Sequence, residues 1–250
     1  MKHVIHSRFH TAPVFIDLIG VGGTGSLVLS GLARLHLSML SLGHPGGLTV
    51  RVWDPDIVTR ANIGRQLFVA EEVGRNKAVA LVTRYNFHHA LNWIAEPRRF
   101  QGNNSVPWKS CHIIISCVDS RHSRAAIHKE LQNRSYQYLI DSGNGNDHGQ
   151  VFIGTPDKPE LPHPWKALPN LIDTTIKENR RASCSLAEAL EHQELFVNQW
   201  MATAILQLLW QLFRHGGLDI RGCYINLASG RMTPVPTEEV KKRRTKNSSK

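Results

Sequence analysis

The residues best suited to chemistry in this sequence begin with a glycine-rich turn, Gly20-Val-Gly22-Gly23-Thr-Gly25. Gly20 allows a tight turn, Gly22 lets backbone N–H groups approach a phosphate, and Gly25 lets the following helix pack close to a sheet. Twenty-nine positions beyond Gly25, a second apolar segment ends at Asp54, whose carboxylate is placed to accept hydrogen bonds from a ribose. This combination predicts a nucleotide-binding site, and the alternative is a turn with only a structural role.

Polar residues that suit a triphosphate follow this acid. They occur in the order Asp54-Pro-Asp56-Ile-Val-Thr-Arg-Ala-Asn62-Ile-Gly-Arg65-Gln66, with Lys77 eleven positions later. An arginine offers a bidentate, permanently charged clamp, and a lysine offers a point charge for a mobile phosphate. An asparagine, an amide and two cations so close to a ribose-binding acid fit a triphosphate better than a nicotinamide.

A carboxylate that could hold a metal ion comes later in the chain. Residues 111–118, CHIIISCV, are almost entirely apolar, as expected of a central strand buried on both faces, and they end at Asp119. At the carboxyl end of such a strand, Asp119 could hold Mg²⁺ against the phosphates.

The elements that must position these residues alternate between strand-like and helical segments. This alternation predicts an α/β fold, a Rossmann-like parallel sheet flanked by helices. The expected strands are 14–19, 48–53, 92–100, 111–118 and 136–141, and the expected helices include 74–91 and 120–134.

The pattern changes after residue 141. Residues 142–149 are rich in turn-forming residues, and 149–154 look like the start of antiparallel additions to the sheet. Residues 155–183 hold five prolines without periodicity, which is typical of a functional crossover loop. We expect one helix over 185–214 and a hairpin over 222–236.

Composition narrows the class of protein. The chain has 250 residues, 41% hydrophobic and 20% charged, with a net charge of +10, as in a soluble globular protein. Six of these charges fall in the last ten residues, so we expect a domain over 1–236 and a disordered basic tail over 237–250. This tail is a weak reason to expect nucleic acid as a partner.

The cysteine spacing and the length of the apolar runs argue against a zinc-binding protein and a membrane protein. Cys111, Cys117, Cys184 and Cys223 form no CxxC pair, which predicts free thiols rather than a zinc site. The longest apolar run is 13 residues and is too short to span a bilayer. The first ten residues lack an apolar signal region, so we expect a cytoplasmic protein and no membrane partner.

The motif series resembles the E1-like activating enzymes, namely the ThiF/MoeB family and the adenylation domains of ubiquitin-type E1 proteins. The family pattern is a GxGGxG turn, D-x-D-x-V-x-x-x-N-x-x-R-Q, a lysine, and a strand ending in C-x-D-N-x-x-x-R. The matches occur in this order over roughly the first 150 residues: Gly20 to Gly25, Asp54 to Gln66, Lys77, and Cys117 to Arg124. Residues 183–199 further resemble ThiF-type proteins of bacterial PRTRC and ubiquitin-like conjugation clusters.

The resemblance implies a reaction and a role for each matched residue. In this family, a protein C-terminal carboxylate attacks the α-phosphate of ATP and yields an acyl-adenylate and pyrophosphate. By resemblance, Asp119 would bind Mg²⁺. The nucleotide ligands would be Gly20, Gly22, Gly23, Gly25 and Asp54, and the phosphate ligands would be Asn62, Arg65, Gln66 and Lys77. The carboxylate would belong to a small ubiquitin-like or sulfur-carrier protein with a glycine-type C-terminus, and an E2-like protein is a further possible partner.

Three features depart from the family pattern or leave alternatives open. Ser120 stands where the family usually has Asn, and the CxxC pairs of many members are absent. Family members often receive an N-terminal arginine from the partner subunit, and Arg8 is the candidate before the first strand. Cys184 could accept the activated carbonyl as a thioester, because Arg180, Arg181 and a helix N-terminus would lower its thiol pKa. The alternative for Cys184 is a packing or capping role.

We also expect a homodimer, because E1-like adenylation domains pair through their sheets and late helices and the 200–213 helix is apolar. Two other functions remain open. One is a non-catalytic E1-like scaffold, against which Arg65, Lys77 and Asp119 argue. The other is an NAD-dependent oxidoreductase, which the cation cluster after Asp54 disfavours.

Overall fold

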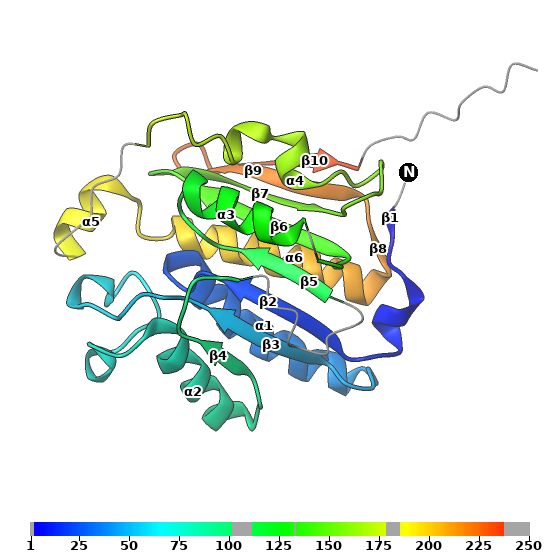
Figure 1. The fold of residues 1–250 in the computed structure, drawn as a ribbon, viewed down its shortest axis with the longest axis horizontal. Helices are drawn as coiled ribbons and strands as arrows, with labels where there is room; N and C mark the ends of the chain where they lie inside the picture. The colour runs from blue at the N-terminus through cyan, green and yellow to red at the C-terminus, as the bar shows by residue number, and fades with distance from the viewer. Residues whose placement is uncertain (1–2, 102–111, 133, 179–185, 238–250) are drawn as a thin grey trace, which may run out of the picture.

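A computed structural model describes residues 3–101, 112–132, 134–178 and 186–237. Within these residues an eight-stranded sheet has the order β10-β9-β7-β6-β5-β2-β3-β4 (Figure 1). Its strands are β2 (Val14–Ile19), β3 (Leu48–Trp53), β4 (Ile94–Glu96), β5 (His112–Ser116), β6 (Tyr138–Asn144), β7 (His148–Gly154), β9 (Ile220–Asn226) and β10 (Arg231–Pro236). A separate pair joins β1 (His3–Val4) to β8 (Gly217–Leu218).

The part of the sheet formed by β2 to β6 is parallel, as predicted. Strand β2 lies between β3 and β5, so the chain moves to one side of β2 first and to the other side later. In an open α/β sheet such a reversal of strand order marks the crevice where ligands bind. Strands β7, β9 and β10 are antiparallel, which confirms the additions and the terminal hairpin.

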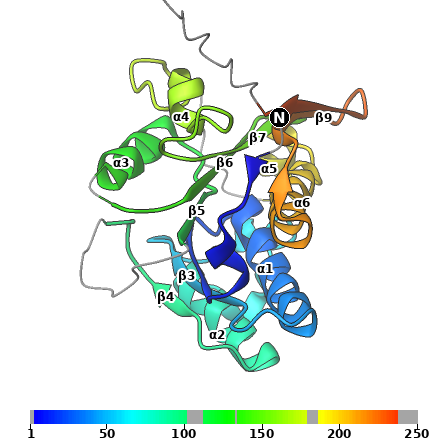
Figure 2. The same ribbon diagram turned by 90° about the vertical axis from the view of Figure 1, so that its right-hand side faces the viewer.

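Helices cover both faces of the sheet (Figure 2). One face carries α1 (Gly23–Ser41), α2 (Lys77–His89) and α6 (Val197–His215), and the other carries α3 (Arg121–Leu131) and the short α4 (Pro164–Ala167). Each face has its own hydrophobic core, and the larger one lies beneath α1, α2 and α6. Short 3-10 helices lie at η1 (Ser7–His10), η2 (Arg60–Asn62), η3 (Ala70–Glu72) and η4 (Pro169–Leu171).

The predicted single helix over 185–214 is wrong, because the chain forms α5 (Leu186–His192) and α6 with a break between them. At the break the Glu194 N–H donates to the Asn146 carbonyl oxygen at 2.8 Å. The Gln193 side chain donates to the Gly145 carbonyl oxygen at 3.3 Å. These bonds to the β6–β7 turn replace the hydrogen bonds that a continuous helix would make.

A buried ion cluster lies within the otherwise apolar sheet. Asp17, in the middle of β2, is fully buried and accepts hydrogen bonds from Arg51 Nε at 2.7 Å and Trp53 Nε1 at 2.7 Å. The His112 ring lies 2.8 Å from its other oxygen. Burial favours protonation of Asp17, but the bonds from His112 and Arg51 outweigh it and hold the pKa of this carboxyl well below its usual range.

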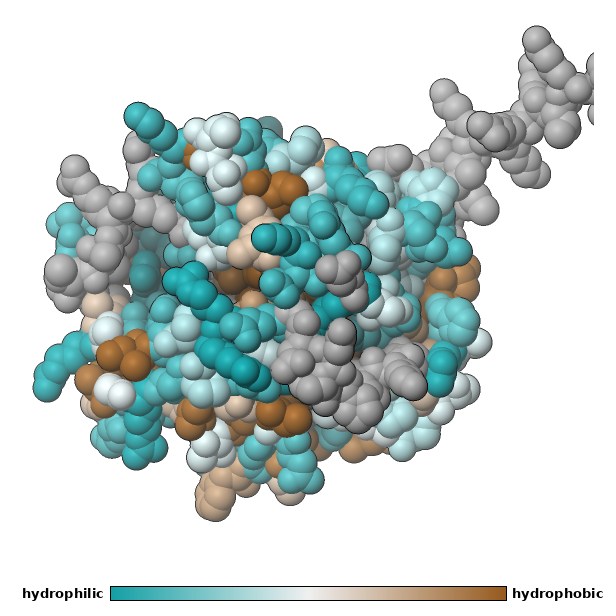
Figure 3. Space-filling model, in the orientation of Figure 1, coloured by the Kyte–Doolittle hydropathy of each residue, from teal (hydrophilic) through white to brown (hydrophobic). Residues whose placement is uncertain are grey.

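The surface carries both hydrophilic and hydrophobic residues. The face seen in Figure 1 is mostly hydrophilic, and its hydrophobic residues form separate small groups (Figure 3). None of the helices in the described ranges is long and apolar enough to cross a membrane.

Candidate active site

The glycine turn and the segments after β3 and β5 meet at one edge of the sheet. The Gly20 N–H donates to the Trp53 carbonyl oxygen at 2.8 Å, and the Cys117 N–H donates to the Ile19 carbonyl oxygen at 2.9 Å. These bonds hold the carboxyl ends of β2, β3 and β5 side by side. The fold therefore brings the predicted glycine turn, Asp54 and Asp119 to the same edge of the sheet.

Two glycines in the turn are required by its geometry. Gly20 has a φ of +84°, a conformation that favours glycine. A Cβ atom at position 25 would lie 1.9 Å from the Gly20 carbonyl oxygen. Helix α1 can therefore begin directly behind the turn, and within the described structure no side chain caps its N-terminus at Gly22. Uncapped N–H groups at a helix N-terminus suit an anion.

Asp54 holds the turn to the end of β3. It is 4% exposed, and its two carboxylate oxygens accept hydrogen bonds from the backbone N–H groups of Val21 at 2.7 Å and Asp56 at 2.9 Å. Burial raises the pKa of Asp54, while these bonds and the charge of Lys77 act in the opposite direction. Ribose binding by Asp54 stays a prediction, and the positioning of the turn is what the contacts establish.

Lys77, the first residue of α2, lies close to Asp54 and Asp56. Its side chain is largely buried, and Nζ lies 3.2 Å from an oxygen of Asp56, whose own side chain is exposed. Asn76, immediately before it, accepts a hydrogen bond from the Val79 N–H at 3.1 Å and caps the helix. The cap and the ion pair fix the position of the predicted phosphate-binding lysine.

Arg65 and Gln66 carry buried polar atoms without a hydrogen-bond partner among the described residues. Burial lowers the pKa of the Arg65 guanidinium, and the nearby charge of Asp119 opposes this effect. Within the described part of the chain, Arg65 Nε and Gln66 Oε1 are buried without a hydrogen-bond partner. Buried polar atoms are rarely left unpaired. A phosphate oxygen could accept a hydrogen bond from Arg65 Nε, and a hydroxyl group or a metal-bound water on that phosphate could donate one to Gln66 Oε1. The residues present therefore fit a nucleotide.

Two predicted residues have local structural roles. Asn62 Oδ1 accepts the Thr59 N–H at 2.9 Å and stabilises η2. Ser120, which replaces the family asparagine, accepts the Ser123 N–H at 3.0 Å and caps α3. A serine is as good a cap as an asparagine, so the departure at position 120 leaves this end of the helix intact.

Arg124 and Asp141 form a supporting ion pair to which sequence reasoning assigned no role. Arg124 is 5% exposed, and its Nε lies 3.0 and 3.1 Å from the two oxygens of Asp141. Its Nη2 donates to the Val118 carbonyl oxygen at 2.9 Å, directly before Asp119. The pair thus holds the loop that carries the predicted metal ligand. The signal in the sequence was the acid at the end of the fifth predicted strand.

A chain of amides, also missed, joins α6 to this edge of the sheet. Asn198 is 4% exposed, and its Oδ1 accepts from Thr24 Oγ1 at 3.1 Å and Asn144 Nδ2 at 2.9 Å. Its Nδ2 donates to Gln193 Oε1 at 3.4 Å, and Arg65 Nη1 donates to the same oxygen at 3.2 Å. A buried asparagine within an apolar helix was the available signal for this network.

A cavity of about 320 Å³ opens beside Asp119. Its polar lining includes Asp119, Asn144, Lys177 and Glu178. Glu178 accepts the Arg121 N–H at 2.8 Å, so the end of the proline-rich segment is fastened to the N-terminus of α3. The described part of this segment therefore forms one wall of the cavity, and its role as a functional loop stays a prediction.

The remaining predicted residues lie elsewhere. Arg8 is exposed and lines a cavity with Tyr138, the first residue of β6, so it lies at the opposite edge of the sheet from this chain's own crevice. Cys184, Arg180 and Arg181 lie outside the described residues. Cys223 is buried and Cys117 half-buried, and burial raises the pKa of Cys223 to about 11 and that of Cys117 to about 12.

Sequence comparison finds relatives among known activating enzymes. Ubiquitin-like modifier-activating enzyme 5 of Drosophila erecta is 25% identical over 144 residues, covering 50% of this chain and 32% of that protein. The Drosophila melanogaster protein is 24% identical over the same length and coverage. The match thus spans about a third of the length of these curated relatives.

Solved structures share the fold at low sequence identity. The crystal structure of PaaA matches with a TM-score of 0.60 at 18% identity, covering 93% of this chain and 66% of that chain. E. coli MccB matches with a TM-score of 0.59 at 15% identity, covering 92% and 65%. The ThiF family model matches residues 11–250, and the chain therefore belongs to the ThiF family of E1-like proteins.

Proposed function

We propose that this protein uses ATP and Mg²⁺ to adenylate the C-terminal carboxylate of a small ubiquitin-like or sulfur-carrier protein. The observation that carries the proposal is the group of buried, unsatisfied atoms on Arg65 and Gln66 between the glycine turn and Asp119. Membership of an E1-like family and the likeness to a ubiquitin-like modifier-activating enzyme support the same reaction class.

The proposed chemistry is a displacement at the α-phosphorus. The carrier carboxylate forms a new P–O bond, the bond to the β-phosphate breaks, and pyrophosphate leaves with the electron pair. The reaction needs positioning and charge neutralisation rather than a general base. Arg65 and Lys77 are the cations for the phosphates, and Asp119 would hold the Mg²⁺ that neutralises them.

The carrier tail would enter by the cavity beside Asp119. The cavity is open, and its side chains include both charges and amides, which suits an extended peptide. A C-terminal glycine has no side chain that could clash with the site, so its carboxylate could approach the α-phosphate closely.

Pyrophosphate–ATP exchange with glycine-ended carrier proteins tests the proposal. The Asp119→Ala variant should abolish exchange, whereas Asp219→Ala, at an exposed acid between β8 and β9, should leave it unchanged. Exchange that survives in Asp119→Ala would contradict the assignment of the metal ligand. ATP binding by the wild type without exchange would favour the scaffold function, and NAD binding without ATP competition would favour an oxidoreductase.

We also propose that the Cys184 thiolate attacks the carbonyl carbon of the acyl-adenylate, so that a C–S thioester bond forms, the C–O bond to the phosphate breaks and AMP leaves. Its position next to the proline-rich segment and the adjacent Arg180 and Arg181 in the sequence support this step. Non-reducing gels should show a thiol-labile adduct with the carrier that Cys184→Ala removes. An adduct that persists in this variant would exclude the thiol of Cys184 as the acceptor.

A further inference from the structure

The amide side chain of Asn198 is in direct contact with the start of α1. Asn198 lies in the first turn of α6 and is buried. A Cβ atom at Gly23 would lie 2.6 Å from the Asn198 amide group, so the glycine turn and this amide are packed against each other. Thr24, the next residue of α1, donates its hydroxyl to Asn198 Oδ1 at 3.1 Å. The amide therefore supports the end of the helix that faces the proposed nucleotide site.

The direction of each hydrogen bond around Asn198 follows from partners that can only donate or only accept. Arg65 Nη1 can only donate, so the Gln193 atom that it meets at 3.2 Å is the oxygen Oε1. Gln193 Nε2 then faces the Gly145 carbonyl oxygen, which can only accept, at 3.3 Å. Asn198 Nδ2 must donate to the same Gln193 oxygen, at 3.4 Å, and this leaves Asn198 Oδ1 to accept from Thr24.

The wall of the cavity beside Asp119 is bonded to the same amide. Asn198 Oδ1 also accepts a hydrogen bond from Asn144 Nδ2, at 2.9 Å. Asn144 is the last residue of β6, and it lines this cavity together with Gly145. Asn198 therefore holds the cavity wall on one side. Through Gln193, it holds the cation proposed to bind phosphate on the other side.

The Asn198 amide has one favourable orientation. A rotation by 180° would turn its N–H groups toward the N–H groups of Asn144 and its oxygen toward the Gln193 oxygen. Because the amide is buried, the hydrogen bonds lost in this way would not be replaced by water. Each bond in such a network also strengthens its neighbours. The positions of Asn144 and Gln193 are therefore set together.

We propose that Asn198 is a positioning residue that serves both substrates of the adenylation reaction. Through Gln193 it orients the Arg65 guanidinium for the phosphates of ATP. Through Asn144 it orients the cavity wall for the tail of the carrier protein. This inference rests on the proposed function, and it names the residue that joins the two binding sites.

Variants of the full chain test this role by separating the two substrates. Asn144→Ala changes the cavity wall, so it should raise the KM for a glycine-ended carrier about threefold or more and leave the Kd for ATP within about twofold of the wild type. Asn198→Ala should raise both constants, because it removes the partner of Asn144 and the partner of Gln193. Pyrophosphate–ATP exchange gives the KM, and titration calorimetry gives the Kd.

A double-mutant cycle for ATP binding distinguishes positioning from a general loss of stability. Asn198→Ala should weaken ATP binding about fivefold or more. If Asn198 acts through Gln193, the double variant with Gln193→Ala should weaken ATP binding by less than the product of the two single effects. Single effects that multiply would overturn the proposed action through Gln193.

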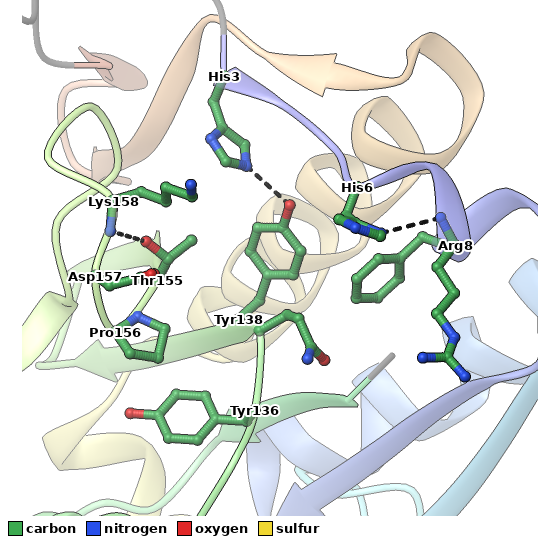
Figure 4. Close-up of a pocket in the computed structure, with 11 residues that line it drawn as sticks. His3, His6, Arg8, Tyr136, Tyr138, Thr155, Pro156, Asp157 and Lys158 are labelled. Carbon is green, nitrogen blue, oxygen red and sulfur yellow. Dashed lines mark hydrogen bonds between the residues drawn. The ribbon is translucent and has the colours of Figure 1, made fainter. Parts of the chain in front are cut away.

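Two substitutions of exposed residues are controls. One is Gln199→Ala, at the next residue of α6, and the other is Lys158→Ala, in the cavity at the opposite edge of the sheet (Figure 4). Both should leave the KM and the Kd unchanged. Thermal melts check that each variant folds. If Asn198→Ala does not fold, Asn198→Asp replaces it, because an ionised carboxylate keeps the shape but cannot donate to Gln193, and it should raise the Kd for ATP.

The possible outcomes separate this inference from the proposed function. A folded Asn198→Ala variant that changes neither constant, or only one of them, would overturn the role of Asn198. A wild type that binds ATP and the carrier without exchange would contradict the proposed function. In that case the Kd values of the variants for ATP and for the carrier, both from calorimetry, decide the role of Asn198.

Discussion

Arg65 and Gln193 are 128 residues apart in the chain, yet Arg65 Nη1 donates to Gln193 Oε1 at 3.2 Å. Gln193 lies at the break between α5 and α6 and also donates to the Gly145 carbonyl oxygen. The guanidinium proposed to bind phosphate is therefore held by the segment that follows the proline-rich loop. This contact links the position of α5 to the position of a phosphate-binding cation.

We predict that Gln193→Ala weakens ATP binding. Loss of a hydrogen bond to a charged group costs about 1.5–3 kcal/mol, so the Kd for ATP should rise on the order of tenfold or more. Titration calorimetry measures this change. Gln199→Ala, at an exposed glutamine of α6, is the control and should bind ATP as the wild type does. Equal affinity in both variants would show that Gln193 does not position Arg65.

We predict that Gly25→Ala destabilises the glycine turn. The new methyl group would meet the Gly20 carbonyl oxygen at 1.9 Å, and neither backbone can move without disturbing β2 or α1. Nucleotide affinity and melting temperature should both fall. Arg34→Ala, at an exposed arginine of the same helix, is the control and should leave nucleotide affinity and melting temperature close to those of the wild type. Melting curves in which Gly25→Ala is the more stable variant would contradict this reading.

Asp17 should make stability depend on pH in the acid range. Its pKa in the folded protein is below the value of about 4 for an unfolded chain, so the unfolded state binds more protons as pH falls. The stabilisation is present above about pH 4 and is lost as pH falls through the folded pKa. Urea unfolding across pH 2–7 measures the onset of this loss.

The variant Asp17→Asn isolates the effect. At neutral pH it should lower the free energy of unfolding by about 3–5 kcal/mol, because Arg51 loses its buried partner. The difference from the wild type should narrow below about pH 4. Asp219→Asn, at an exposed acid, should follow the wild-type curve. A constant difference over the whole pH range would refute the role of Asp17.

We predict a homodimer that uses the N-terminal end of α6. Most apolar side chains of this helix are buried within the chain, but Phe196 is 64% and Trp200 42% exposed beside its start. Sedimentation velocity should give the mass of a dimer, and Phe196→Glu with Trp200→Glu should shift it to a monomer. Gln207→Glu on the exposed face of α6 should not. A single monomer mass for the wild type would contradict the prediction.

The parallel sheet and the glycine turn could be predicted from the sequence because their signals are local. Apolar runs such as residues 111–118 report burial on both faces, whatever they pack against. The turn at Gly20 and Gly25 needs a positive φ and a close approach, and few residues other than glycine allow both. The alternation of strands and helices up to residue 141 followed from these patterns.

Other features of the site depend on residues that meet only after folding. The helix over 185–214 is broken because Gln193 and Glu194 bond to the β6–β7 turn, and no periodicity within the segment reports that competition. Arg124 had no assigned role because its partner, Asp141, belongs to another strand.

The sequence by itself determined that the chain has a glycine-rich turn between a strand and a helix, the cations Arg65 and Lys77 after the next strand, and an acid at the end of a central strand. The tertiary structure decided which of these side chains lie at the same edge of the sheet, and it placed Arg8 at the opposite edge. The physical reason is the distance along the chain over which each feature is determined. Backbone conformation and burial produce periodic patterns of residue types within a short segment. A contact such as that between Arg65 and Gln193 depends instead on the packing of several elements at once.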